Sequence, residues 1–112
     1  MGAMSRNKGK RGELEIAHIL QEHGYPARRS VQFNGWQGEA DVIGVEGLHI
    51  EVKRVEKLNI ETAMEQSRRD AKGNEIPVVF HRRNGKKWLA TLSLDDFLNL
   101  YQNNNQYYGK GY

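Results

Sequence analysis

Residues 48–54 have the sequence LHIEVKR, in which apolar and charged side chains alternate. Because successive side chains of a β-strand point to opposite faces of a sheet, this alternation predicts a strand with two unlike faces. The three apolar residues share one face, and His49, Glu51 and Lys53 share the other. The stretch therefore predicts a strand that buries one face and presents a carboxylate beside an ammonium group on the other.

The segment before this strand is expected to pair with it. The run from Ala40 to Val45 is short, apolar and β-branched, and Glu46-Gly47 is a turn signal, so the two segments are predicted to form a hairpin. A two-residue turn would set Asp41 opposite Val52, pointing away from the charged face. One additional turn or bulge residue, which a nearby glycine can supply, would set Asp41 opposite Glu51. We predict the second register.

The rest of the chain predicts an α/β fold in which helices cover the faces of a mixed sheet. Apolar residues about 3.6 positions apart and capping signals indicate helices, whereas β-branched runs bounded by turn signals indicate strands. The expected order is helix, three strands, helix, two strands and helix. Ser93 and Asp96 resemble a capping box for the last helix. Besides the hairpin, we predict helices at Lys8–His23, from the cap Asn59 to Lys72-Gly73-Asn74, and at Leu94–Tyr101, and strands at Ala27–Phe33, Ile76–His81 and Lys87–Leu92.

The 112 residues suit one compact domain, and 38% hydrophobic with 28% charged residues excludes a chain that is disordered throughout. No cysteine is present, which excludes disulfides and thiolate metal sites. The sequence shows no membrane-spanning run and no signal peptide, so we expect a cytoplasmic protein without a membrane partner. We interpret residues 1–7 as a tag remnant and flexible basic arm, 8–102 as the domain and 103–112 as a disordered tail.

Basic residues outnumber acidic ones only slightly, with 17 Lys and Arg against 14 Asp and Glu and a net charge of +3. Their clustering is more informative, because groups of lysine and arginine can follow a phosphate backbone. A well-solvated surface would show similar clusters, and both interpretations stay open for any one of them. The candidate DNA contacts are Arg6, Lys8, Lys10, Arg11, Arg28, Arg29, Arg82 and Arg83.

Asp41 and Glu51, set side by side by the predicted register, would repel each other, and a divalent cation would remove that repulsion. Oxygen donors without thiolates favour Mg²⁺, with Mn²⁺ as a substitute, and the backbone carbonyl of Ile50 or Val52 could complete the ligands. A cation there could bind a scissile phosphate and lower the pKa of a water, while Lys53 holds that water or stabilises the transition state. The alternative is a cross-strand ladder of salt bridges on an exposed face, and spacing alone does not decide between them.

With these residues, the stretch from Lys8 to Leu92 resembles the PD-(D/E)XK nuclease superfamily, and within it archaeal-type Holliday junction resolvases and related phage-borne endonucleases. The family motif is an aspartate at the start of one strand and Glu-x-Lys on the next, which correspond here to Asp41 and Glu51-Val52-Lys53. The resemblance implies a restriction-endonuclease-like αβββαβ core, followed here by a C-terminal hairpin strand and helix. Ala40 stands where the family name has proline, and the spacing from Asp41 to the glutamate is shorter than in the resolvases.

The resemblance also implies roles for residues outside these two strands. Lys8-Gly9 stands where the resolvases open with Lys-Gly, so Glu13 is the expected metal-reaching glutamate of the first helix, with Glu15 as its rival. Arg29-Ser30 matches the family's Arg-Ser before the substrate loop, which adds Ser30 to the candidate DNA contacts. Gln66 matches the polar residue that the second helix of many members lends to the site, and an ordinary exposed glutamine is the alternative.

Together these features predict a Mg²⁺-dependent endodeoxyribonuclease whose catalytic residues are Glu13, Asp41, Glu51, Lys53 and Gln66. The resemblance implies a structure-selective enzyme that cuts Holliday junctions or other branched DNA as a homodimer, without a small-molecule cofactor, in a bacterial host or phage-infected cell. A nicking or general phage nuclease is one alternative, and a DNA-binding module without catalysis is another. The apolar side chains of the last helix could form the dimer interface.

Overall fold

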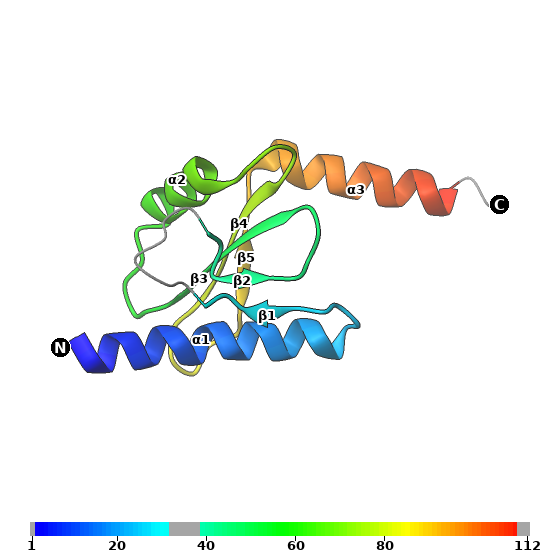
Figure 1. Ribbon diagram of the computed structural model, residues 1–112. Coiled ribbons are helices and arrows are strands. Elements are labelled where there is room, and N and C mark those ends of the chain that lie inside the picture. Colours follow the sequence, from blue (N-terminus) through cyan, green and yellow to red (C-terminus); the bar gives the residue numbers. More distant parts are fainter. Residues whose placement is uncertain (1, 32–38, 110–112) are drawn as a thin grey trace.

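The computed structural model describes the backbone of residues 2–31 and 39–109 and the side chains of residues 9–31 and 39–103. Within them the elements follow the predicted order of helix, three strands, helix, two strands and helix (Figure 1). The helices are α1 (Gly2–Glu22), α2 (Ile60–Asp70) and α3 (Leu94–Gly109), and the strands are β1 (Arg28–Arg29), β2 (Val42–Ile43), β3 (Leu48–Arg54), β4 (Ile76–Arg82) and β5 (Leu89–Thr91).

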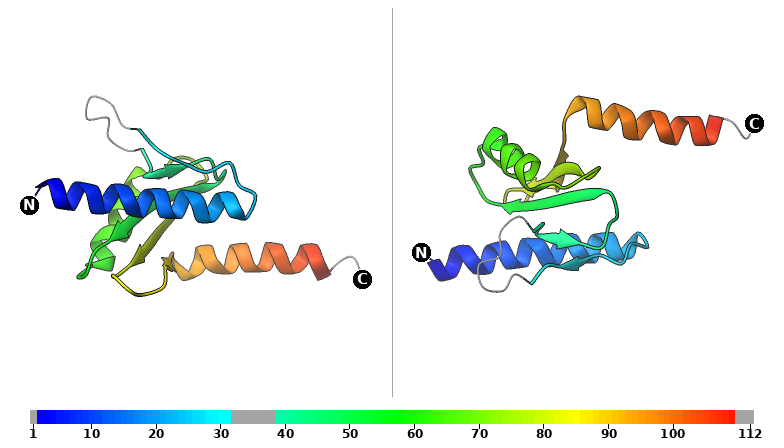
Figure 2. Two further views of the ribbon diagram at one scale, coloured as in Figure 1. Left: turned by 90° about the horizontal axis from the view of Figure 1, so that it is seen from below. Right: turned by 45° about the horizontal axis from the view of Figure 1, so that its top comes forward.

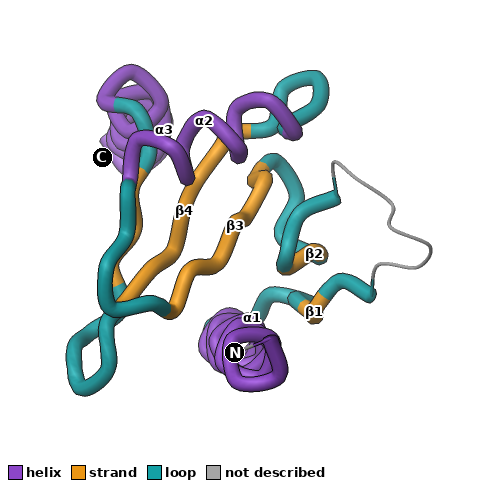
Figure 3. The backbone as a smooth tube through the Cα atoms, turned by 90° about the vertical axis from the view of Figure 1, so that its left-hand side faces the viewer, coloured by secondary structure: helices purple, strands orange, loops and turns teal. Residues whose placement is uncertain are grey.

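The described strands form one mixed sheet in the order β1-β2-β3-β4-β5. Neighbouring strands are antiparallel except β3 and β4, which run parallel, and α2 makes the crossover that a parallel pair requires. α3 extends away from the sheet (Figure 2), whereas α1 and α2 lie against its opposite faces (Figure 3). The predicted α/β class, a mixed sheet with helices on its faces, is confirmed.

Two apolar clusters hold these layers together. On the face that α1 covers, Ile16 of α1 packs with Ile50 and Val52 of β3. On the face that α2 covers, Met64 of α2 packs with Val79 of β4. Burial of each such side chain contributes about 1.5 to 3 kcal/mol, so the clusters fix both helices on the sheet. β3 is covered on both faces, which explains why its central residues are shielded from water.

The register of the β2–β3 hairpin is the one predicted. Val42 pairs with Ile50, so the preceding residue Asp41 stands opposite Glu51. Gly44 permits this register, because its φ of +99° lies in the left-handed region and a Cβ atom there would collide with a backbone carbonyl of the segment after α1. A glycine therefore supplies the additional residue that moves the hairpin by one position.

The short strands depart from their predicted bounds. β1 and β2 are shorter than the predicted strands Ala27–Phe33 and Ala40–Val45, and β5 is shorter than Lys87–Leu92. Residues 32–38, which include the end of the first prediction, lie outside the described residues. All residues of β1 pair with β2 and all residues of β5 pair with β4, so these short strands consist of their paired residues alone. β3, by contrast, has the predicted bounds from end to end.

Both terminal helices are longer than predicted. α1 begins at Gly2 rather than at Lys8, and α3 continues to Gly109 rather than ending at Tyr101. Neither extension contains a proline, and a helix that has formed its first turn propagates through polar residues at little cost. Despite their length, none of the helices described is apolar enough to cross a membrane.

The predicted helix caps are present. Asn59 Oδ1 accepts a hydrogen bond from the Thr62 N–H at 3.1 Å at the start of α2. Ser93 Oγ accepts one from the Asp96 N–H at 3.1 Å at the start of α3. Each cap satisfies an N–H group that the first helical turn leaves without a partner, which fixes where the helix begins.

Candidate active site

Asp41, Glu51 and Lys53 lie together on the sheet face that α2 covers. Glu51 and Lys53 are two positions apart on β3, and the hairpin register sets Asp41 beside Glu51. The Val52 N–H donates a hydrogen bond to Asp41 Oδ2 at 2.8 Å, and the Asp41 N–H donates one to the Ile50 carbonyl at 2.9 Å. These two bonds hold Asp41 against β3, so the structure brings together the three residues of the predicted motif.

Asp41 is a carboxyl group that is kept from water beside other carboxylates. Burial, and then repulsion from Glu51, raise the pKa of Asp41 from its ordinary 3.8 to about 7. The hydrogen bond from Val52 and the charge of Lys53 act in the opposite direction but do not cancel the rise. Without a bound cation, Asp41 is therefore partly protonated at neutral pH.

α1 brings Glu13 into the same cluster. Burial raises the pKa of Glu13, the bond to Arg29 opposes this rise, and the charge of Glu51 adds to it. The charge of Glu13 in turn raises the pKa of Asp41. Arg29 Nε donates to Glu13 Oε1 at 2.6 Å and compensates part of the negative charge. The helical glutamate expected from the resemblance thus lies within electrostatic reach of the motif.

Glu15, the rival of Glu13 on α1, has a different set of neighbours. Its carboxylate accepts hydrogen bonds from Arg54 Nη1 at 2.9 Å and from Trp88 Nε1 at 3.1 Å, and two from Arg82 at 3.2 Å. Arg54 follows Val52 by two positions and faces α1, on the opposite side of the sheet from Glu51. We refer to Glu15, Arg54, Arg82 and Trp88 as the arginine network. Within this network, the positive charges of the two arginines compensate the negative charge of Glu15.

Glu51 is only 1% exposed, which is rare for a carboxylate. Its Oε2 atom has no hydrogen-bond partner among the residues that the structure describes. His49 Nε2 lies 3.6 Å from this oxygen, beyond hydrogen-bond distance but within reach of an ion pair. Leaving a buried polar atom without a partner costs about 1 to 3 kcal/mol, and more if it is charged, so Glu51 is poised for a further positive partner.

His49 belongs to this cluster, although the sequence did not single it out. It is 2% exposed, and its Nδ1 lies 3.6 Å from Glu75 Oε1. The contact with Glu51 raises the pKa of His49, while burial lowers it. The signal in the sequence was its place two positions before Glu51, on the same face of a strand. His49 therefore compensates part of the Glu51 charge.

The donor set fits a hard divalent cation, although its members do not yet converge on one point. In the part of the chain that the structure describes, no three His, Asp or Glu side chains are arranged to hold an ion. Asp41 is bonded to the Val52 N–H instead, and Glu13 is bonded to Arg29. A cation would relieve both the repulsion between the carboxylates and the unpartnered oxygen of Glu51, and carboxylate oxygens are the donors that Mg²⁺ prefers.

α2 places Gln66 on the helix that covers the motif. Ser67 Oγ donates a hydrogen bond to the His49 carbonyl at 3.2 Å, which joins α2 to β3 two positions before Glu51. Gln66 precedes this contact by one residue and is half-buried. The Val52 side chain, in contrast, packs in the core on the α1 face, so only its backbone is available to the site.

Some of the candidate DNA contacts are already bonded to other residues of the protein, and others are exposed. Arg29 is bonded to Glu13, and Arg82 belongs to the arginine network. Ser30 is buried, and its N–H donates to the Asp41 carbonyl at 2.9 Å. The side chains of Arg6 and Lys8 lie outside the described residues. The exposed members of the predicted set are Lys10, Arg11, Arg28 and Arg83.

The chain matches a family model described as "Phage putative PDDEXK endonuclease" over residues 4–110. This range includes all five candidate catalytic residues and every described helix and strand except the first two residues of α1. No curated protein matches the chain. The family match, the element order and the hairpin register agree with the resemblance drawn from the sequence.

Proposed function

The chain belongs to this family of phage PDDEXK endonucleases, and we propose that it hydrolyses phosphodiester bonds in DNA with a divalent cation held by Asp41 and Glu51. The observation that carries the proposal is Glu51, a carboxylate shielded from water whose Oε2 lacks a hydrogen-bond partner among the described residues. A salt-bridge ladder on an exposed face would pair opposite charges. The register instead sets two carboxylates side by side, which argues for a site that binds a cation.

In the proposed mechanism, Asp41 and Glu51 would hold the cation, and Glu13 and the Val52 backbone carbonyl would be further ligands. When bound, such a cation stabilises charge on the phosphate and lowers the pKa of a water. The Val52 N–H keeps the Asp41 carboxylate oriented. The Lys53 ammonium, on the same face as Glu51, holds the attacking water or stabilises the negative charge that develops on the phosphate.

The cover that α2 provides strengthens these interactions. A site shielded from water has a low local dielectric, so each charge in it acts more strongly on the phosphate than it would in solution. We assign to Gln66 the role of a polar group that orients the attacking water from the α2 side. Its half-buried position next to the contact between Ser67 and β3 supports this role.

We propose Mg²⁺ as the cation, with Mn²⁺ as a substitute. The donors at the site are carboxylate oxygens and a backbone carbonyl, and the chain has no cysteine. Thiolate and imidazole donors would favour Zn²⁺, whereas oxygen donors favour Mg²⁺ and Mn²⁺. No small-molecule cofactor is required for this chemistry.

We propose that the enzyme holds DNA through its phosphate backbone. The exposed side chains of Lys10, Arg11, Arg28 and Arg83 are best suited to this contact. Arg6 and Lys8, at the start of α1, are further proposed contacts. The engaged residues Arg29 and Ser30 would support the site from its rim, whereas Arg82 would act through the arginine network on the other face of the sheet. Backbone contacts of this kind carry no sequence information, and the affinity that they provide falls steeply with salt.

From the resemblance we infer selectivity for Holliday junctions or other branched DNA, and a homodimer acting in a bacterial host or phage-infected cell. α3 supports the dimer, because Leu94, Phe97, Leu100 and Tyr101 are each at least 44% exposed and the Phe97 and Tyr101 rings stack 6.0 Å apart. A monomer would leave this apolar surface in water. A light-scattering mass of one chain at micromolar concentration would contradict the dimer.

The proposed function is tested by cleavage of labelled four-way junction, flap and linear duplex DNA with Mg²⁺ and with Mn²⁺. Wild type should cut in either cation and not in chelator, and Lys53→Ala should not cut. Lys57→Ala is the matched control, because Lys57 is an exposed lysine just beyond β3. Failure of the wild type to cut any of these substrates would favour a DNA-binding module. Equal cutting of duplex and junction would favour a general nuclease.

A further inference from the structure

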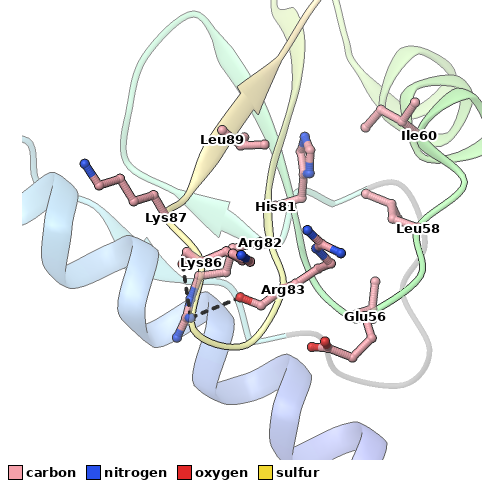
Figure 4. A pocket seen from close by; sticks show the side chains of 10 residues that line it. Glu56, Leu58, Ile60, His81, Arg82, Arg83, Lys86, Lys87 and Leu89 are labelled. Atoms are coloured by element: carbon pink, nitrogen blue, oxygen red, sulfur yellow. Dashed lines mark hydrogen bonds between the residues drawn. The ribbon is translucent and has the colours of Figure 1, made fainter.

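A cavity of about 500 Å³ opens between the start of α2 and the turn that joins β4 to β5 (Figure 4). Its volume falls in the range of small-ligand sites, roughly 300 to 1,000 Å³. Apolar and basic side chains make up most of its lining, and Glu56 is its acidic member. The residues that matter here are Leu58, Ile60, Leu89, His81, Arg83 and Lys86.

The cavity continues the row of side chains that begins at the candidate active site. Lys53 of β3 pairs in register with His81 of β4, and His81 pairs with Leu89 of β5. Side chains that are directly opposite on neighbouring strands share one face of the sheet, and neighbouring strands lie about 4.8 Å apart. The cavity therefore lies over β4, the β-strand next to that of Lys53, and on the same face of the sheet. A single strand of DNA can reach both.

The apolar part of the cavity surrounds His81. In Figure 4 the His81 ring lies between Leu89 on one side and Leu58 and Ile60 on the other. Leu89, the first residue of β5, is 59% exposed although it pairs with His81 in the sheet. Burial lowers the pKa of His81, and its Nε2 is 2.9 Å from Thr91 Oγ1, so the ring is neutral and held in place. These groups offer a flat ring and aliphatic walls, which suit a planar apolar ligand.

The basic part of the cavity is held in position by the turn itself. The Arg82 guanidinium is turned toward α1, where it belongs to the arginine network, and it donates to the carbonyls of Arg83 and Lys86 at 3.3 and 3.4 Å (Figure 4). Glu56 Oε2 accepts the Asn84 N–H at 2.8 Å and ties down the same turn. The Arg83 side chain points into the cavity beside His81. The turn thus presents cations next to an apolar floor.

We propose that this cavity binds an unpaired nucleotide of the DNA strand that is cut, with the base against Leu58, Leu89 and His81 and the phosphate on Arg83 and Lys86. The proposal rests on the proposed nuclease function. A base within a duplex is stacked and paired and cannot enter, whereas every unpaired base has a face that packs on rings and aliphatic groups. The cavity therefore gives the enzyme a preference for DNA with a single-stranded nucleotide beside the cleavage point.

The test compares two ligands with the same phosphates, a labelled short oligothymidylate and an abasic oligomer of equal length, by fluorescence anisotropy in chelator. Wild type should bind the oligothymidylate about fivefold more tightly or better, the factor expected for packing one base. Leu89→Ser should remove this difference, and Arg83→Ala should weaken binding of both ligands equally. Tyr25→Ser and Arg68→Ala, which change exposed residues away from the cavity, should leave both affinities unchanged.

Equal affinity of wild type for the two ligands would overturn the proposal without the use of any variant. A base preference that survives Leu89→Ser would overturn it as well, since Leu89 is exposed and its replacement leaves the core intact. Metal-dependent cleavage measured in parallel separates this proposal from the proposed function. Cleavage without a base preference rejects the nucleotide pocket alone, and a base preference without cleavage rejects the nuclease alone.

Discussion

β3 carries a charged cluster on each of its faces, and the two clusters are built in opposite ways. On the α1 face, both carboxylate oxygens of Glu15 accept hydrogen bonds within the arginine network. On the α2 face, Glu51 is buried beside Asp41, and its Oε2 lacks a hydrogen-bond partner in the described chain. The protein pairs the carboxylate of the first cluster with its own cations, whereas His49 and Arg29 compensate only part of the negative charge of the second.

This difference between the two faces distinguishes charges that stabilise the fold from charges that are available to bind a ligand. A carboxylate that is surrounded by its own cations has no vacancy for another and ties α1 to β3, β4 and the β4–β5 turn. Carboxylates that repel one another destabilise the fold unless another group offsets their repulsion. A bound cation is the simplest such group. Glu13 and Glu15 are only two positions apart on α1, yet they belong to different clusters.

The largest expected effect is on cleavage by Glu51→Gln. The substitution keeps the shape of the side chain and removes the charge that binds the cation, so cleavage should fall by about 10³-fold or more. Rates on a labelled junction with Mg²⁺ provide the measurement. Glu22→Gln, at the exposed end of α1, is the control for loss of one negative charge. A Glu51→Gln enzyme that cuts within a few fold of wild type would place the site elsewhere.

The next effect is on stability, and Glu15→Gln should show it. Loss of the carboxylate charge leaves Arg54 and Arg82 near each other without compensation. Breaking a fully buried pair costs 3 to 5 kcal/mol, and Glu15 is about one-third exposed, so we expect a loss of about 2 to 3 kcal/mol in urea unfolding. Cleavage per folded molecule should stay near wild type. If Glu15→Gln is as stable as wild type but cleaves DNA poorly, Glu15 rather than Glu13 is the glutamate of α1 that serves the active site.

A smaller effect of opposite sign is expected from Asp41→Asn. Because its pKa is about 7 in the folded protein and near 3.8 when unfolded, the metal-free wild type loses stability as pH rises between these values. Asparagine removes that loss, so the variant should be more stable than wild type by about 1 to 2 kcal/mol at pH 8 and should show no advantage near pH 4. Thermal unfolding in chelator at several pH values measures this. A variant that is less stable at pH 8 would show that the carboxylates are compensated after all.

The smallest effect concerns the salt dependence of DNA binding. Each lysine or arginine that contacts a phosphate contributes about 0.9 to the slope of log affinity against log salt. Arg83→Ala should lower the slope by about that amount. Arg28→Ala should do the same if its exposed side chain also contacts the backbone. Arg68→Ala, on the outer side of α2, should not change it. If the salt dependence is unchanged in both Arg83→Ala and Arg28→Ala, neither arginine contacts the DNA backbone.

The sequence predicted the parts of the fold that local physics determines. The bounds of β3 follow from strict alternation in residues 48–54, and the start of α2 follows from Asn59, whose side chain caps it. The position of Asp41 opposite Glu51 also followed, because a glycine that can adopt a positive φ stands where the bulge was needed. The start of α1 and the end of α3 were not predicted, since polar residues without proline are compatible with both helix and coil.

The sequence could not predict the arginine network or the burial of His49. Glu15 meets Arg54 and Arg82 across 39 and 67 positions, so only the folded chain brings them together. One signal was present: Arg54 stands two positions after Val52, on the apolar face of β3, where an arginine requires an acidic partner. His49 shares the face of Glu51 but is buried only because α2 covers it, which depends on packing rather than on local pattern.

The central claim, that the incompletely compensated carboxylates form a cation site, is tested most directly by calorimetric titration of Mg²⁺ and Mn²⁺ in the absence of DNA. Wild type and Glu15→Gln should bind the cation with similar affinity, and Glu51→Gln should bind it at least about tenfold more weakly, because a charged ligand has been lost. Equal binding by all three proteins, or loss of binding in Glu15→Gln alone, would contradict the assignment of the site to Asp41 and Glu51.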